Sequence, residues 1–276
     1  MKPRAFDYVR PDTAAEAIDL LAQHGEDARI MAGGQSLMAI LNLRMSETKV
    51  IIDIGGHEDF KGIKVAGGYL EVGASVTQNE LLSWPELAKT APLLAKAMPW
   101  VGHFQTRNRG TVCGSLSHAD PSSEIPLSLA TLGGEVVLRS KRGERVLAAE
   151  EFQTGMLSTA READEMMVAA RFPIAPNLRR AAFREVARRH GDFAILALAA
   201  VADDDKSVRL GIGGLADRPV ATRIDTTSKA AIAEALGTIA WELEGSDDIH
   251  ATARYRRDLL RRLGPIVIEE AIACAA

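Results

Sequence analysis

Two adjacent glycines, Gly33 and Gly34, constrain the fold of this chain more than any other feature of its sequence. They follow the apolar run 30–32 and precede a second apolar run at 37–41, a pattern that predicts a strand, a tight turn and a helix. A backbone bent in this way turns several N–H groups toward one point, which makes a binding site for an anion such as phosphate. Many glycine pairs only turn the chain, so this segment alone leaves both interpretations open.

The overall composition excludes several classes of protein. The 276 residues are enough for one large or two ordinary domains, and the net charge of −4 comes from acidic and basic residues interspersed along the chain. No basic patch favours nucleic acid or an anionic membrane surface, and no apolar run reaches the roughly 18 residues that a membrane span needs. The N-terminus lacks the apolar core of a signal peptide, so we expect a cytoplasmic protein.

Residues that could bind a metal are few and scattered. The two cysteines, Cys113 and Cys274, are far apart, and the six histidines never approach the His-Glu-x-x-His spacing of a zinc site. We therefore expect no disulfide framework, no metal site and no iron–sulfur cluster ligated by this chain.

The first part of the chain predicts a small α/β unit. A helix is expected over 13–24, with Asp12 or Thr13 as its N-cap and Gly25 at its end. Strands at 28–32 and 49–54 follow, with a helix at 37–44 between them. Arg44, at the end of that helix, either faces a phosphate or is solvated.

From Gly62 the pattern changes to short strands and glycine turns. Residues 63–66 and 69–74 predict a hairpin, followed by a helix capped by Thr77 or Asn79. The Gly-x-Ser at 73–75 lacks the second glycine of a nucleophile elbow, which argues against serine hydrolysis. The remaining elements expected before residue 173 are single helices at 86–98 and 122–132 and strands at 134–140, 144–148 and 165–172.

A second segment rich in glycine and hydroxyl groups covers residues 100–121. Thr111, Gly114 and Ser115 can donate hydrogen bonds to a pyrophosphate, while Asp120 or Glu124 can accept from ribose hydroxyls. The alternative is a tight loop in which Asp120 only starts the next helix and Glu124 lies in its first turn. Neither Gly-x-Gly-x-x-Gly after a strand nor the P-loop motif occurs, so any nucleotide is held in another way.

The interruption at 172–177, which contains two prolines, is the expected domain boundary. Beyond it we expect strands at 182–187 and 208–215, a strand or a helix at 192–201, and helices at 226–241 and 250–276. Five arginines on the last helix form either a solvated face with acidic partners or a surface for another subunit: Arg254, Arg256, Arg257, Arg261 and Arg262.

Four motifs in order make the sequence resemble the flavoprotein (medium) subunit of the molybdenum hydroxylases. They are Ala-Gly-Gly-Gln-Ser at 32–36, Arg-Asn-Arg-Gly-Thr-Val-Cys-Gly-Ser at 107–115, His-Ala-Asp-Pro at 118–121 and Arg-Arg-His-Gly-Asp-Phe-Ala at 188–194. The family includes the carbon monoxide dehydrogenase medium subunit and the flavin domain of xanthine dehydrogenase, and the resemblance covers essentially the whole chain.

The resemblance implies an α+β fold. Two N-terminal α/β subdomains, at about 1–56 and 57–176, would form a PCMH-type FAD-binding domain over residues 1–176. A small C-terminal domain of antiparallel sheet and helices, of the carbon monoxide dehydrogenase flavoprotein type, would follow at 177–276.

The same resemblance implies that FAD lies between the two N-terminal subdomains. The backbones of the first and second motifs wrap the pyrophosphate, and an acid lies near the adenosine ribose. Apolar and basic side chains contact the cofactor, and the loop at 191–193 approaches the isoalloxazine ring. The residues at these positions are Ala32, Gly33, Gly34, Gln35, Ser36, Leu37, Val101, Thr111, Val112, Cys113, Gly114, Ser115, Asp120, Glu124, Met167, Arg184, Asp192 and Phe193.

In one place the sequence departs from the family pattern. The second motif commonly contains Gly-Gly, and here Cys113 replaces the first glycine. A small side chain fits there if the residue keeps φ below zero. The thiol is either buried and inert or a group close to a redox cofactor.

The function implied by the resemblance is that of an oxidoreductase subunit. In this family electrons leave the substrate at a molybdopterin cofactor in a large subunit and cross two [2Fe–2S] clusters in a small subunit. They reach an external acceptor through the FAD of the medium subunit. The complex is expected to be a heterohexamer, a dimer of heterotrimers.

This chain has neither a cysteine set for clusters nor a recognisable molybdopterin site. We therefore expect an electron-transfer subunit that does not bind the hydroxylated substrate. Two alternatives stay open. One is a structural subunit without flavin, and the other is a free-standing flavin oxidoreductase with its cofactor attached at Cys113 or His118.

Overall fold

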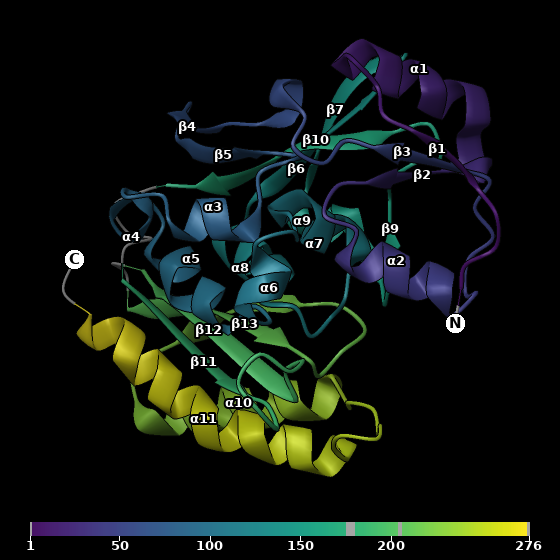
Figure 1. Cartoon of the computed structure of the whole chain (residues 1–276). Coiled ribbons are helices and arrows are strands. Elements are labelled where there is room, and N and C mark those ends of the chain that lie inside the picture. Colours follow the sequence, from purple (N-terminus) through teal and green to yellow (C-terminus); the bar gives the residue numbers. More distant parts are fainter. Residues whose placement is uncertain (1, 175–179, 204–205, 275–276) are drawn as a thin grey trace.

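The computed structural model describes residues 2–174, 180–203 and 206–274. In Figure 1 the sheets of the N-terminal half lie at the top, a group of short helices lies in the middle, and a second large sheet with two long helices lies below. The domain boundary expected at 176–177 falls outside the described residues and stays a prediction.

The first sheet is parallel, with strand order β1-β3-β2. Helix α1 (Ala14–His24) packs on it and begins where the Thr13 hydroxyl accepts a hydrogen bond from the Glu16 N–H at 3.1 Å. The expected helix and strands of this unit are confirmed. The strands are β1 (Asp7–Val9), which is too short to predict, β2 (Ala28–Met31) and β3 (Val50–Asp53).

The second sheet is antiparallel and has the order β4-β5-β10-β6-β7. The hairpin expected at 63–74 forms its edge, and the strands expected before residue 173 form the rest. The five strands are β4 (Ile63–Ala66), β5 (Tyr69–Gly73), β6 (Glu135–Ser140), β7 (Gly143–Ala148) and β10 (Met166–Pro173). A separate pair, β8 (Gln153–Gly155) and β9 (Ser158–Thr159), lies between β7 and β10 in sequence.

Short helices fill the layer between the sheets of the N-terminal half and the C-terminal sheet (Figure 1). The prediction of one helix over 86–98 is wrong, because the chain breaks at Ala91, which precedes Pro92 and leaves the helical region. The helices are α2 (Gln35–Asn42), α3 (Gln78–Leu82), α4 (Leu87–Thr90), α5 (Pro92–Ala97), α6 (Phe104–Arg107), α7 (Val112–His118), α8 (Glu124–Leu132) and α9 (Ala149–Phe152). Single 3₁₀ turns occur at Gly25–Asp27, Glu58–Phe60 and Met98–Trp100.

The C-terminal sheet is antiparallel with the order β11-β12-β13-β14. Helices α5 and α8 contact it from the N-terminal half, and α10 and α11 pack against it as well. The segment left open as strand or helix is the strand β12, whose side chains are all buried and alternate between two hydrophobic cores. The elements are β11 (Ala181–Val186), β12 (Leu196–Ala202), β13 (Ser207–Gly213), β14 (Val220–Asp225), α10 (Lys229–Glu242) and α11 (Ala253–Ala273).

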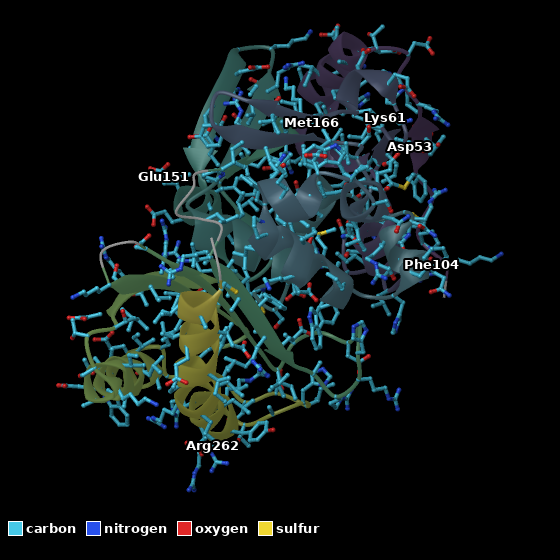
Figure 2. All side chains as sticks on the ribbon, turned by 90° about the vertical axis from the view of Figure 1, so that its left-hand side faces the viewer. Asp53, Lys61, Phe104, Glu151, Met166 and Arg262 are labelled. Carbon is cyan, nitrogen blue, oxygen red and sulfur yellow. The ribbon has the colours of Figure 1, made fainter. Side chains whose placement is uncertain are left out.

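The arginines of α11 do not form one uniform face. Arg256 is only 3% exposed and donates hydrogen bonds to the carbonyls of Ile195 and Gly214 and to the Asp248 carboxylate. Arg262, in contrast, is exposed and points away from the body of the molecule (Figure 2). Arg256 therefore holds the helix onto the sheet, and only the others can be solvated or contact a partner. No helix of the described part of the chain is long and apolar enough to cross a membrane.

Candidate functional site

A cavity of about 570 Å³ lies where the first sheet and α2 face α7 and β10. This volume is within the usual range for a site that binds a small molecule or cofactor. The loop 191–193, which precedes β12, completes one end of the cavity. The two glycine-rich motifs, far apart in sequence, therefore line one cavity.

The two glycines of the first motif are needed for different reasons. Gly34 has φ +70° and is the N-cap residue of α2, a left-handed conformation that a side chain disfavours. A Cβ on Gly33 would lie only 2.1 Å from the Arg109 carbonyl oxygen and 2.7 Å from the Gly110 Cα. The first motif therefore packs directly against the backbone of the second.

The second motif is the start of a helix, which the sequence did not predict. The Thr111 hydroxyl accepts a hydrogen bond from the Gly114 N–H at 3.0 Å and so caps α7. The backbone just before it is fixed from α3, because the Gln78 N–H donates to the Gly110 carbonyl at 2.8 Å. The expected glycine loop is therefore a capped helical turn held from both sides.

Most of the predicted cofactor-binding residues line this cavity. The exceptions are Val112, Asp120 and Arg184. Val112 is fully buried in the hydrophobic core, and the Asp120 carboxylate accepts a hydrogen bond from the Ser122 N–H at 2.8 Å. The predicted residues that line the cavity are Ala32, Gly33, Gly34, Gln35, Ser36, Leu37, Val101, Thr111, Cys113, Gly114, Ser115, Glu124, Met167, Asp192 and Phe193.

Arg184 lies on the opposite side of its strand from the cavity. Side chains of β11 alternate, so Arg184 faces α11, where its guanidinium forms an ion pair with the Glu270 carboxylate. The neighbouring Phe183 instead packs against Trp100, with their ring centroids 6.4 Å apart. Arg184 is therefore not among the residues that line the cavity.

Cys113 occupies its unusual position without strain. It lies inside helix α7, where φ is negative, and its thiol donates a weak hydrogen bond to the Val72 carbonyl at 3.5 Å. Burial raises the pKa of the Cys113 thiol to about 12. The thiol is therefore protonated at neutral pH, which favours the interpretation as an inert buried cysteine and argues against flavin attachment there.

Several polar residues that the sequence did not single out also line the cavity. Gln78 is only 5% exposed, and its side-chain oxygen finds no hydrogen-bond partner among the described residues. Arg161 lies at the wall near Arg29, and burial, followed by the positive charge of Arg29, lowers the pKa of Arg161. Neither pattern nor spacing distinguishes these three side chains in the sequence, because they belong to no motif.

Of the two acids predicted near the ribose, Glu124 is the one that lines the cavity. It is the first residue of α8 and is only 6% exposed. Burial first, and then the neighbouring charge of Asp120, raises the pKa of Glu124 to about 7. A carboxylate in this position can accept hydrogen bonds from ligand hydroxyls while its charge is sensitive to pH near neutrality.

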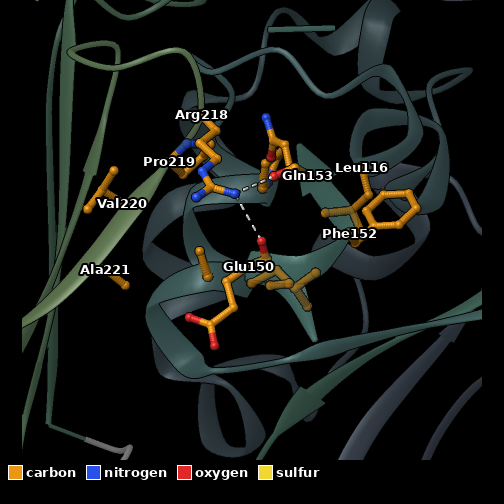
Figure 3. Close-up of a pocket in the computed structure, with 12 residues that line it drawn as sticks. Leu116, Glu150, Phe152, Gln153, Arg218, Pro219, Val220 and Ala221 are labelled. Carbon is orange, nitrogen blue, oxygen red and sulfur yellow. Dashed lines mark hydrogen bonds between the residues drawn. The ribbon is translucent and has the colours of Figure 1, made fainter. Parts of the chain in front are cut away.

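A smaller cavity of about 110 Å³ lies between α8, α9 and β14. Figure 3 shows Arg218 at its edge, donating hydrogen bonds of 3.1 Å to the backbone carbonyls of Glu150 and Gln153. None of the predicted site residues lines this cavity. In the described part of the chain, no three histidine, cysteine or acidic side chains come together as metal ligands.

Family comparisons agree with the geometry of the larger cavity. Residues 4–175 match the FAD binding domain in molybdopterin dehydrogenase, and residues 181–271 match the CO dehydrogenase flavoprotein C-terminal domain. The chain belongs to the FAD-binding medium subunits of the molybdenum hydroxylases.

Individual relatives resemble this medium subunit over most of their length. Caffeine dehydrogenase subunit beta of Pseudomonas sp. strain CBB1 is 39% identical over 225 residues, which cover 80% of this chain and 76% of that protein. The nicotine 6-hydroxylase medium subunit of Paenarthrobacter nicotinovorans is 34% identical, with 98% and 99% covered. A solved carbon monoxide dehydrogenase from Hydrogenophaga pseudoflava superimposes with a TM-score of 0.92 at 28% identity, with both chains fully covered.

The side chains of this medium subunit fit FAD as its cofactor. The glycine turn at Gly33 and Gly34 lines the cavity with backbone, whose N–H groups suit a pyrophosphate. The apolar side chains of Val101 and Met167 form another part of the wall, which suits ring systems. The unpartnered oxygen of Gln78 and the buried carboxyl of Glu124 supply acceptors for N–H and O–H groups. The chain is thus the flavoprotein subunit of an oxidoreductase.

Proposed function

We propose that this medium subunit transfers electrons from the [2Fe–2S] clusters of a small subunit to an external acceptor through FAD held in the larger cavity. The observation that carries the proposal is the packing of Gly33 against Arg109 and Gly110, which makes one wall from the two glycine motifs. When bound, the flavin supplies the electron-transfer chemistry, and the chain positions it.

Each part of the cavity has a distinct role in this proposal. The backbone N–H groups of 32–36 and 111–115 face the pyrophosphate, because dipoles can meet its charges where no Rossmann helix is present. The Glu124 carboxylate accepts a hydrogen bond from a hydroxyl of the adenosine ribose. Val101 and Met167 contact the rings of the cofactor. Asp192 and Phe193 lie at the isoalloxazine end, where Phe193 is 63% exposed and accessible to a partner.

The chain is not expected to bind the hydroxylated substrate. Relatives whose names refer to caffeine and to nicotine match it over most of their length, so substrate choice is expected to lie in another chain. We propose that a large molybdopterin subunit and a small iron–sulfur subunit complete a heterotrimer, that two heterotrimers pair, and that the complex is cytoplasmic.

Reconstitution of the purified full chain with FAD tests the proposal. We expect stoichiometric flavin in the absorption spectrum, and its release into the supernatant on acid precipitation, since the protonated Cys113 thiol does not attach it. Complete absence of flavin after reconstitution would show that the chain is the structural subunit without cofactor. Flavin that precipitates with the protein would instead support the free-standing enzyme with covalent FAD.

Replacement of Glu124 by alanine tests the ribose contact in particular. We expect FAD binding to weaken by about 1–3 kcal/mol, because a buried ligand hydroxyl loses its acceptor. Flavin fluorescence titration at constant pH measures the change. The matched control is Glu144→Ala on the edge strand β7, an acid outside the cavity, which should leave the affinity unchanged.

A further inference from the structure

A second acid, Glu185 of β11, touches the acid of the cavity from the C-terminal sheet. The carboxyl groups of Glu185 and Glu124 are in hydrogen-bonding contact, although one comes from a strand of the last sheet and the other from the start of α8. Glu185 itself does not line the cavity. It can therefore reach a ligand only through Glu124.

The contact between the two acids requires a proton. Both carboxylate oxygens of Glu185 are shielded from water, and no N–H or O–H donor of the described residues reaches them. Two ionised carboxylates in contact and shielded from water repel each other strongly, so the hydrogen atom that joins them has to be a carboxyl proton. The other charged groups that face the pair are Asp120, which adds negative charge, and Arg107 of α6, which partly offsets it.

We propose that Glu185 is a positioning residue for FAD binding, which holds a proton and donates it in a hydrogen bond to Glu124, so that Glu124 faces the cavity as an ionised acceptor. This inference rests on the proposed binding of FAD in the cavity. It extends the binding site into the C-terminal sheet, through a residue that makes no contact with the ligand.

The arrangement makes FAD affinity depend on pH in a defined direction. Burial, and then the charge of Glu124, raises the pKa of Glu185 to about 8. The proton stays on Glu185 at neutral pH because a backbone N–H and the charge of Arg107 stabilise the ionised form of Glu124, whereas no donor among the described residues reaches Glu185. When the pH rises above 8, Glu185 loses its proton, the two carboxylates repel each other, and Glu124 is no longer held in place to accept from the ribose. FAD binding is thus stronger near neutral pH than above pH 8.

Flavin fluorescence titration of the full chain between pH 7 and pH 9 tests the proposal. The wild type should lose about tenfold in FAD affinity over this range, because binding is linked to one proton. Glu185→Gln keeps a neutral donor toward Glu124 and should bind FAD at pH 7 like the wild type, with no alkaline loss. Glu144→Gln, the same change on the exposed strand β7, should keep the alkaline loss.

A second measurement needs no variant. Titration calorimetry of the wild type with FAD at pH 9, in two buffers of different ionisation enthalpy, should show uptake of nearly one proton on binding. A wild-type affinity that stays constant with pH, an alkaline loss that persists in Glu185→Gln, or binding without proton uptake would each overturn the role of Glu185. Failure of the wild type to bind FAD at any pH would instead overturn the proposed function.

Discussion

The two glycine motifs line one cavity, but each is held in its conformation in a different way. The first, around Gly33 and Gly34, is a turn whose shape depends on a missing side chain and on a left-handed residue. The second, around Thr111 and Gly114, is a capped helix start held by side-chain and backbone hydrogen bonds. The comparison shows that this wall of the cavity is held in shape for two reasons, steric exclusion on one side and hydrogen bonding on the other. Substitutions should therefore affect the two sides to different degrees.

The largest effect is expected at Gly33. Gly33→Ala places a Cβ into the backbone at Arg109, so the two motifs have to separate, which should lower the free energy of unfolding by about 3 kcal/mol or more and abolish FAD retention. Gly34→Ala is the matched control. Its Cβ would meet only the flexible side chains of Met31, at 3.3 Å, and Met38, at 3.6 Å, and the left-handed conformation costs about 1 kcal/mol.

Chemical denaturation and the flavin content of the purified variants measure both changes. If Gly33→Ala and Gly34→Ala were equally destabilised, contact between the two motifs would not be the reason for the first glycine.

A smaller effect is expected at Thr111. Thr111→Ala removes the N-cap of α7 and should lower the free energy of unfolding by about 1 kcal/mol, together with FAD affinity. Thr77→Ala is the control, since Thr77 caps α3 in the same way but does not line the cavity. Urea denaturation should show similar losses for the two variants, and flavin titration should show weaker binding only for Thr111→Ala. Equal FAD affinity in both would mean that the cap does not shape the binding site.

The smallest effect is expected at Cys113. Cys113→Ala should leave FAD affinity unchanged, because the thiol is buried within α7 and hydrogen-bonds to the backbone of β5. In the wild type at pH 8, iodoacetamide should modify the partly exposed Cys274 and leave Cys113 intact, since a thiol with a pKa near 12 forms almost no thiolate. Mass spectrometry of the peptides distinguishes the two sites. Rapid modification of Cys113 in the folded chain would reopen a redox role.

Local signals in the sequence predict most of the fold. The strand, glycine turn and helix between 28 and 42 follow from apolar runs around two glycines, and the Thr77 cap follows from the Glu80 three residues later. Helix α7 could not be predicted in this way. Its residues include Gly114 and two serines, which are weak helix formers, and its stability comes from the Thr111 cap and from burial of Val112 and Leu116.

The two glycine motifs are the part of the site that the sequence predicts best. Most of their backbone positions line the cavity, because these positions depend on local chain geometry. Arg184 shows the limit of this reasoning, since its strand turns the side chain toward α11, while the adjacent Glu185 reaches Glu124. Gln78 shows another limit, because only the folded chain places it beneath the backbone of Gly110.

The contact of Gly33 with Arg109 and Gly110 also has a consequence for the order of folding. The first motif cannot make its final contact with the second until the second, encoded much later in the chain, has been synthesised and has closed a long loop. During translation the strand and helix around Gly33 can form early, but the wall that the two motifs build together cannot. Cofactor loading should therefore follow completion of both motifs, which makes FAD a ligand of the nearly finished subunit.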